Sequence, residues 1–142
     1  MLSFLKNKTS NDVDINDSYS KIASLLIHAA KIDENYTNKE KQIINKTLLE
    51  LGAEKSKIDN IMSNAKIIEE NSNQILDFTK EVKNTPESDK IKIVESIWKI
   101  IYSNNDADIY ETNLMRRLAG LLYIDAKTMG YLKEKVKKNL PK

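Results

Sequence analysis

The sequence repeats an acidic pattern at an offset of 71 residues, and this repeat restricts the possible folds most strongly. The stretches IDENYTNKE (residues 32–40) and NNDADIYE (104–111) align Asp33 with Asn104 and Glu40 with Glu111. Helical apolar patterns flank both stretches and also coincide at this offset, in the pairs Ile22 and Ile93, Leu26 and Ile97, Ala30 and Ile101, Ile43 and Leu114, Ile44 and Met115, and Leu51 and Leu122. We therefore expect two pseudo-symmetric helix–acidic turn–helix units that pack their apolar faces together.

The apolar periodicity predicts an all-α fold, a bundle of about seven helices. Only 3 Gly and 2 Pro occur in 142 residues, which suits helices joined by short turns and argues against a sheet-rich fold. The expected helices run from Tyr19 to near Asp33, from a capping box at Thr37–Glu40 to Gly52, over 54–69, over 72–83, from Pro86 at the first helical position through Ile101, from a cap at Asp108 through Leu122, and from a cap at Asp125 through Leu140. We expect residues 15–140 to form one domain and residues 1–14 to be a flexible polar lead.

Composition excludes several classes of protein. Without Cys, the chain has no disulfide, thiolate zinc site or cysteine nucleophile. A net charge of +2 gives no case for a protein built around nucleic-acid electrostatics. We expect no signal peptide, because Met1–Lys6 is short and is soon followed by polar residues, and no stretch approaches the roughly 20 apolar residues of a membrane span. The expected location is the cytoplasm.

The acidic turns offer oxygen ligands for a divalent cation. Ca²⁺ takes six to eight oxygens, mainly from carboxylates and carbonyls. The candidate metal residues are Asp33, Glu40, Asn104, Asp106 and Glu111. Neither turn is an EF-hand, because position twelve holds Ile44 or Arg117 instead of the bidentate Glu. An alternative stays open: Glu40 and Glu111 act only as capping-box residues, and the other acids only favour helix N-termini.

No complete catalytic constellation is present, so we expect no enzyme activity and no cofactor beyond a divalent cation such as Ca²⁺ or Mg²⁺. His28 is the only histidine, and we expect it in the core or at its boundary instead of acting as a base or ligand. The aromatic residues of the second unit are expected to be core and rim residues, namely Trp98, Tyr102, Tyr110 and Tyr123. The lysine-rich C-terminal helix is a weaker candidate for contact with nucleic acid or anionic lipid.

The repeated pattern resembles the tellurite-resistance protein B (TerB)-like domain family, over roughly residues 15–140. The first half carries the resemblance in Ala29 to Glu34 with Glu40 in register, and the second in Trp98 to Asn105, Tyr110-Glu111, Leu114 to Ala119 and Leu121-Leu122. The resemblance implies an all-helical module, metal binding at the acidic turns, partner domains and, for some members, roles in tellurite resistance or stress. The chain departs from the pattern where Glu34 and Asn105 replace the turn glycines and Asn104 replaces the second Asp.

The leading functional hypothesis is a non-enzymatic TerB-like interaction module that binds another protein and takes a divalent ion at its acidic turns. Because Asn104 lacks the charge of Asp33, we expect the first turn to hold an ion better. One alternative is a pure protein–protein scaffold in which the acids serve only as caps. Another is weak binding of nucleic acid or an anionic membrane through the lysine-rich helix.

Overall fold

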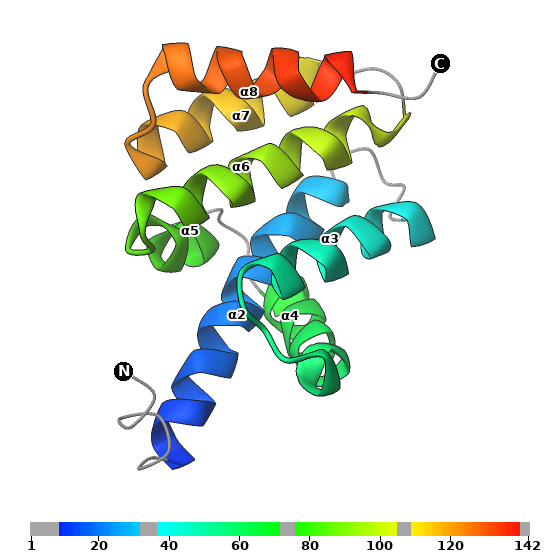
Figure 1. Cartoon of the computed structure of the whole chain (residues 1–142), viewed down its shortest axis with the longest axis vertical. Coiled ribbons are helices and arrows are strands. Elements are labelled where there is room, and N and C mark those ends of the chain that lie inside the picture. Colours follow the sequence, from blue (N-terminus) through cyan, green and yellow to red (C-terminus); the bar gives the residue numbers. More distant parts are fainter. Residues whose placement is uncertain (1–8, 32–36, 72–75, 105–108, 140–142) are drawn as a thin grey trace.

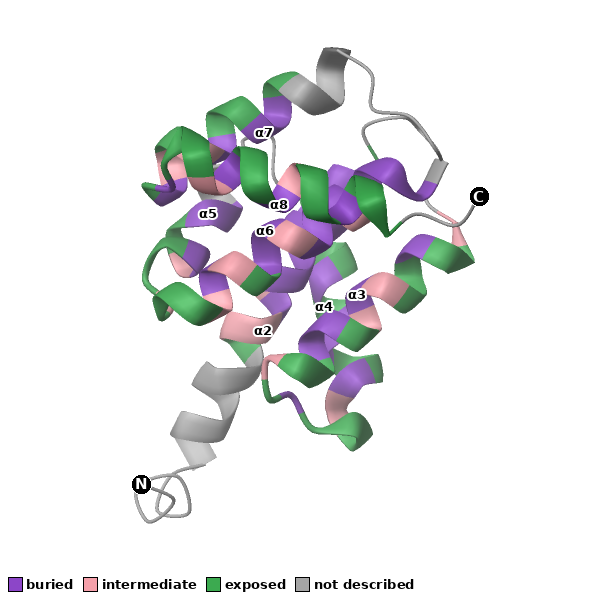
Figure 2. Ribbon diagram, turned by 45° about the horizontal axis from the view of Figure 1, so that its top comes forward, coloured by how far each residue is buried: buried purple, intermediate pink, exposed green. Residues whose placement is uncertain are grey.

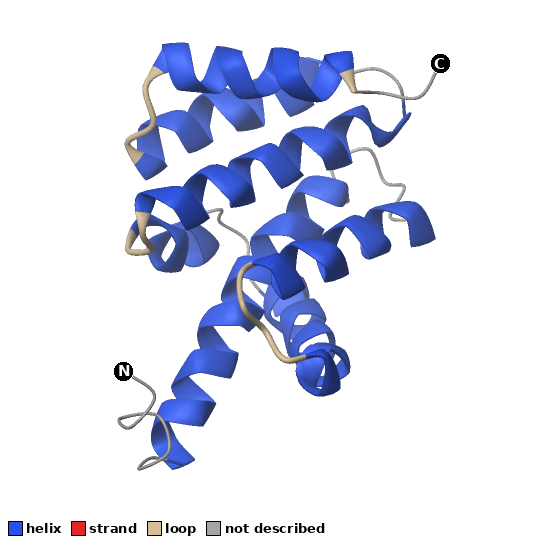
Figure 3. Ribbon diagram, viewed as in Figure 1, coloured by secondary structure: helices blue, strands red, loops and turns tan. Residues whose placement is uncertain are grey.

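The computed structural model describes the backbone of residues 9–31, 37–71, 76–104 and 109–139, and the side chains of 17–31, 37–71, 78–103 and 113–139. This part of the chain contains seven α-helices, two short 3-10 helices and no strand, which confirms the predicted all-α bundle (Figure 3). The elements are α2 (Thr9–Ala30), α3 (Asn38–Glu50), η1 (Lys55–Lys57), α4 (Ile58–Asn71), α5 (Leu76–Lys83), α6 (Glu87–Ile101), η2 (Tyr102–Asn104), α7 (Ile109–Leu122) and α8 (Ala126–Lys138).

The predicted repeat is confirmed, and it is longer than a helix–turn–helix unit. At the offset of 71, the ends of α2 and α6 coincide, as do the starts of α3 and α7. The start of η1, which leads into α4, likewise coincides with the start of α8. Each unit therefore has three helices, α2–α3–α4 and α6–α7–α8, with α5 between the units.

Helix α6 lies in the middle of the molecule (Figure 1). It packs against α2 and α3 of the first unit and against α8 of its own unit, while α5 packs on α2 and α7. A buried hydrogen bond of 2.6 Å joins the hydroxyl groups of Thr47 on α3 and Ser96 on α6. The two units therefore share one core, whose largest fully buried side chains include Leu25, Leu26, Ile44, Leu48, Phe78, Ile93, Ile97 and Met115 (Figure 2).

Helices α2 and α4 approach closely because small residues line their contact. Ser20, Ala23 and Ser24 on α2 and Ala65 on α4 are fully buried. The Ser24 hydroxyl is 2.7 Å from the Ser20 carbonyl and 3.1 Å from the Ala65 carbonyl. Small side chains let the backbones come together, and the serine hydroxyl meets its hydrogen-bonding requirement against main-chain oxygens.

The capping residues at three helix ends were predicted from the sequence, and one of them, Pro86, lies one position earlier relative to its helix than expected. Gly52 closes α3 at a φ of +111°, as its position in the sequence predicted. Asp125 caps α8 by accepting from the Thr128 amide at 2.7 Å, and hydrogen bonding to Thr128 lowers the pKa of the Asp125 carboxyl. Pro86 is the N-cap of α6 and not its first helical residue, because its ψ of 152° is extended while its carbonyl already accepts from Lys90.

Two other predicted boundaries differ. Helix α2 begins at Thr9, inside the segment expected to be a polar lead, and it ends at Ala30, three residues before Asp33. The proposed cap at Asp108 lies outside the described residues. Apolar periodicity locates the buried part of a helix and carries little information about a polar extension such as the start of α2.

Candidate functional site

We call residues 32–40 the first corner and residues 104–111 the second corner. The first corner contains a complete capping box at the start of α3. The Glu40 amide donates to the Thr37 hydroxyl at 3.4 Å, and the Thr37 amide donates to Glu40 Oε1 at 2.7 Å. The Thr37 hydroxyl also lies 3.1 Å from Glu40 Oε1. Glu40 is only 1% exposed. The prediction that these two residues cap the helix is confirmed.

The end of the first corner contacts Ser103, the residue before Asn104. The Lys39 ammonium donates to the Ser103 carbonyl at 3.0 Å, and the Ser103 hydroxyl lies 3.5 Å from Glu40 Oε2. Because the same hydroxyl donates to the Ile100 carbonyl at 2.6 Å, its contact with Glu40 is the weaker of the two. Lys39 and Glu40, at the end of the first corner, thus contact the backbone and the side chain of the residue that directly precedes the second corner.

The metal prediction falls mainly outside the described residues. Asp33 and Asp106 are among the undescribed positions, and the side chains of Asn104 and Glu111 are also outside the description. Across the described ranges, no group of three or more His, Cys, Asp or Glu side chains could hold an ion. Glu40 suits the role of a helix cap that stabilises the turn, because the Thr37 amide and hydroxyl already contact one of its carboxylate oxygens. The ion site stays a prediction.

A second buried carboxylate, Glu69 on α4, was missed by the sequence analysis. Its two oxygens contact Lys31 at 2.7 Å and His28 Nδ1 at 3.3 Å. His28 also packs on Phe78, with 5.5 Å between the ring centroids, and its side chain is 31% exposed. This agrees with the predicted boundary position of His28. Glu69 lies four residues after buried Ala65, so an acid in the apolar stripe of α4 was the available signal.

The lysine-rich helix α8 uses several of its cations internally. Lys135 pairs with Glu95 at 3.1 Å, and this contact raises the pKa of Lys135. Lys133 lies 5.6 Å from the centre of the Trp98 ring, and Lys137 is 4.0 Å from Glu134. Intramolecular contacts reduce the charge that α8 can direct outward, so they weaken the case for nucleic-acid or lipid binding.

The aromatic residues divide between core and surface. Trp98 and Tyr102 are buried and stacked, with centroids 5.9 Å apart, as expected. Tyr123 and Tyr131 are 72% and 66% exposed. The exposure of Tyr131 was not predicted, and the side chain of Tyr110 is outside the described residues.

A family model described as "Tellurite resistance protein TerB" matches residues 20–134. No curated protein and no solved structure matches the chain. Among the residues that the structure describes, no helix combines the length and apolar character needed to cross a membrane.

Proposed function

The chain belongs to the tellurite resistance protein TerB family, and on this premise we propose that it is a non-enzymatic, cytoplasmic interaction module whose acidic corners respond together to a divalent cation. The observation that carries the proposal is the junction at Ser103. Lys39 and Glu40 of the first corner contact this residue, which directly precedes the second corner. On this proposal, a conformational change in one corner is transmitted to the other through the contacts with Ser103.

The residue types at the corners suit a hard cation. Asp33, Asn104 and Asp106 supply side-chain oxygens of the kind that Ca²⁺ and Mg²⁺ prefer. Glu40 fixes the start of α3 through its capping box, and Glu111 occupies the equivalent position in the second repeat of the sequence. The bound ion would supply positive charge that draws the acidic side chains together. The corners would then present one ordered face to a partner protein.

A pure scaffold is the second candidate, and the completed capping box favours it. Both reciprocal bonds between Thr37 and Glu40 are formed, so the protein itself supplies partners for the Glu40 carboxylate. A cap of this kind stabilises a helix by roughly 0.5–2 kcal/mol, which is sufficient reason for an acid at position 40. In this case the partner-binding face is independent of divalent cations.

Thermal unfolding in chelator, and then in millimolar Ca²⁺, Mg²⁺, Mn²⁺ or Zn²⁺, separates the two candidates. A cation at about 100 times its dissociation constant adds about 2.7 kcal/mol to the free energy of unfolding. For a chain of this length, we expect the melting temperature to rise by roughly 5–10 °C. Asp33→Asn should remove most of this rise.

The matched control is Glu134→Gln, which removes an exposed acid on α8 and should leave the cation response unchanged. Equal melting temperatures in chelator and in every cation would overturn the cation-dependent proposal and leave the scaffold. Capture of proteins from cell extract in Ca²⁺ and in chelator tests the interaction role. No specific partner under either condition would contradict both candidates.

The lysine-rich helix remains the alternative site for nucleic acid or anionic lipid. Binding through it should weaken steeply with salt, because lysines that neutralise phosphates release counterions. Titrations against duplex DNA and anionic vesicles at two salt concentrations check this alternative. The contacts of Lys133 and Lys135 within the protein lead us to expect flat curves.

A further inference from the structure

A pocket of about 200 Å³ lies where the middle of α2 meets the end of α3 and the start of α6, at the opposite end of α3 from the capping box. Ile22 is the buried residue of its lining, and the other lining residues are half-buried, namely Ser18, Tyr19, Leu51, Thr85 and Asp89. These half-buried side chains keep surface that a ligand can reach. The volume is below the roughly 300–1,000 Å³ of sites for drug-sized molecules, so the space suits a ligand as small as a single side chain.

Of the residues that line the pocket, only Asp89 carries a formal charge. Within the described part of the chain, its carboxylate has no ion-pair or hydrogen-bond partner. Burial, and then the charge of Asp89, raises the pKa of the Tyr19 phenol, so the carboxylate lies close enough to act on that ring. A half-buried carboxylate near an aromatic ring attracts a cation, because both the negative charge and the ring face favour it.

The helix ends around the pocket also favour a cation. Leu51 is the C-cap of α3, whose last turn contains no basic residue, so the helix itself does not compensate the partial negative charge of this end. Asp89 lies in the first turn of α6, and its full negative charge exceeds the partial positive charge of that helix end. Lys21, the only lysine of α2, pairs with Asp17 and Glu81.

The second unit places an ammonium group at the equivalent helix end. At the offset of 71, Leu51 corresponds to Leu122 and Tyr19 corresponds to Lys90. The buried Lys90 ammonium donates to the Leu122 carbonyl at 3.1 Å. In the first unit the Tyr19 hydroxyl donates to the Leu51 carbonyl at 3.1 Å, which satisfies the carbonyl without supplying a positive charge.

We propose that this pocket binds a primary alkylammonium group, carried either by a small amine or by a lysine side chain of a partner protein. The ammonium donates to the Asp89 carboxylate, and the alkyl chain packs along Tyr19 and Leu51. The Thr85 hydroxyl, which donates its proton to the Val82 carbonyl, offers its lone pairs as a further acceptor. The site is separate from the acidic corners and needs no divalent cation.

n-Butylamine, which reproduces a lysine side chain, is the probe, and NMR of the tyrosine rings is the measurement. In chelator, at neutral pH and constant ionic strength, the Tyr19 signal should shift with a dissociation constant on the order of 1–10 mM, as suits so small a ligand. The signals of exposed Tyr123 and Tyr131 should stay in place, because neither residue lines the pocket. 1-Butanol lacks the charge and butyrate reverses it, so neither should give a saturable shift.

Asp89→Asn tests the residue that carries the proposal. It should weaken binding about tenfold, which corresponds to the loss of one hydrogen bond to a charged group. Asp59→Asn is the matched control, because Asp59 is exposed on α4 and lies outside this pocket, and it should leave the affinity unchanged. A circular-dichroism melt verifies that both variants fold. A stationary Tyr19 signal, or equal affinity in Asp89→Asn and the unmodified chain, would overturn the proposal.

A short peptide, acetyl-Gly-Lys-Gly-amide, distinguishes the two sources of the ammonium. If it shifts the Tyr19 signal as butylamine does, the opening admits a lysine that is attached to a polypeptide, which supports a partner protein as the source. If butylamine alone shifts the signal, the site is one for a small free amine. The acetylated-lysine form of the peptide keeps the chain but removes the charge, and binding of this form as tightly as the lysine form would contradict an ammonium site.

Discussion

Gly52 and Tyr123 hold equivalent positions in the two units, and both have a positive φ. Each closes the second helix of its unit, with φ of +111° and +57° respectively. In both units, the amide of the next residue donates a hydrogen bond to a carbonyl of the helix. The Ala53 amide donates to Leu48 at 2.9 Å, and the Ile124 amide donates to Ala119 at 3.0 Å. Tyrosine in this region costs about 1–2 kcal/mol, which the Lys83 ammonium 4.7 Å above its ring partly offsets.

Gly52→Ala should lower the free energy of unfolding by about 2 kcal/mol, because the backbone there is left-handed. The added methyl carbon would also lie 3.0 Å from the Tyr19 hydroxyl. Gly130→Ala is the matched control, since Gly130 lies within α8 with open space around its Cβ position. This control should raise the free energy of unfolding by about 0.5–1 kcal/mol. Urea unfolding measures both, and equal effects would contradict the argument.

Local chemistry at single residues was largely predictable. The Thr37–Glu40 box, the Gly52 terminus and the Asp125 cap each depend on residues close together in the sequence. The contacts of Ser103 with Lys39 and Glu40 were not predictable, because they join residues more than 60 positions apart. No local pattern encodes which two turns will touch.

At the scale of helices, the two units secure the same helix end by different chemistry. The Tyr19 hydroxyl on α2 donates to the Leu51 carbonyl at 3.1 Å. The Lys90 ammonium on α6 donates to the Leu122 carbonyl at 3.1 Å. The two donors occupy equivalent positions at the repeat offset of 71, and so do the two acceptors. Each bond satisfies a carbonyl at a helix C-terminus, which has no partner within its own helix.

Tyr19→Phe and Lys90→Met should each lower the free energy of unfolding by about 1–2 kcal/mol, since each leaves a helix-end carbonyl without its donor. Lys92→Met replaces an exposed lysine on the same helix as Lys90 and should change stability little. Urea unfolding provides the comparison. An effect of Lys92→Met as large as that of Lys90→Met would show that loss of charge, and not the bond, is responsible.

The Tyr19 bond also predicts a pH dependence. Burial, followed by the charge of Asp89, raises the pKa of the Tyr19 phenol above its ordinary value of 10.0. The neutral phenol is therefore favoured in the folded chain. Its stabilisation is complete below the unfolded pKa and is lost as the pH rises through the folded pKa. Unfolding measured across the alkaline range should show a smaller loss of stability in Tyr19→Phe than in the unmodified chain.

The third helix of each unit was predicted as a helix but not as part of the repeat. Its signal was present, because buried Ile58, Ile61 and Ala65 of α4 align with buried Met129, Leu132 and Val136 of α8. Apolar residues at helical spacing are common to many unrelated helices, so these matches alone were weak. The common packing of α4 on α2 and α8 on α6 makes the equivalence clear.

At the scale of the whole molecule, each unit completes the core of the other. Helix α6 contacts both α2 and α3, and the Thr47–Ser96 bond is buried where the units meet. Fragments 1–71 and 72–142, prepared separately, should each have low helicity, because separation exposes apolar side chains from this interface. Mixing them should restore helicity and a cooperative melt in circular dichroism. Cooperative melting of either fragment alone would contradict this expectation.

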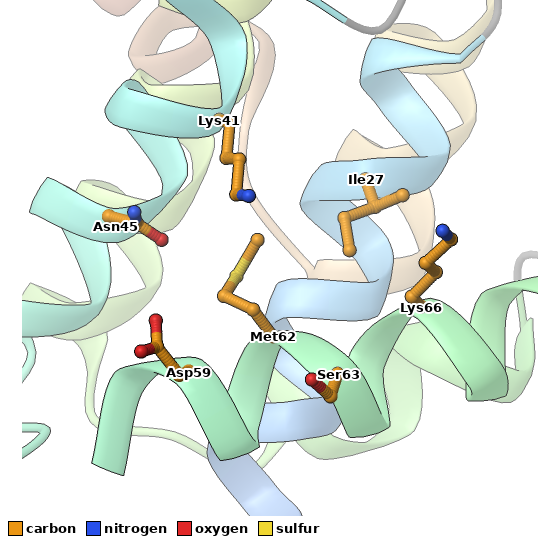
Figure 4. A pocket seen from close by; sticks show the side chains of 7 residues that line it. All are labelled: Ile27, Lys41, Asn45, Asp59, Met62, Ser63 and Lys66. Carbon is orange, nitrogen blue, oxygen red and sulfur yellow. The ribbon is translucent and has the colours of Figure 1, made fainter. Parts of the chain in front are cut away.

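A pocket between α2, α3 and α4 (Figure 4) was not predictable from the sequence, because its shape depends on side chains from three helices. Ile27, Lys41 and Met62 are unremarkable in their separate apolar or charged patterns. Only the packing of α2, α3 and α4 brings them around one space.

The burial of Trp98 gives the two halves different optical properties. As the only tryptophan of the chain, it confines intrinsic indole fluorescence to the α6–α8 half, where its ring is stacked on Tyr102 beneath Lys133. A red shift of the emission therefore reports the opening of the second unit, whereas the far-ultraviolet ellipticity averages over both. If the units unfold as one, the two signals change at the same denaturant concentration, and any separation between them measures the independence of the first unit.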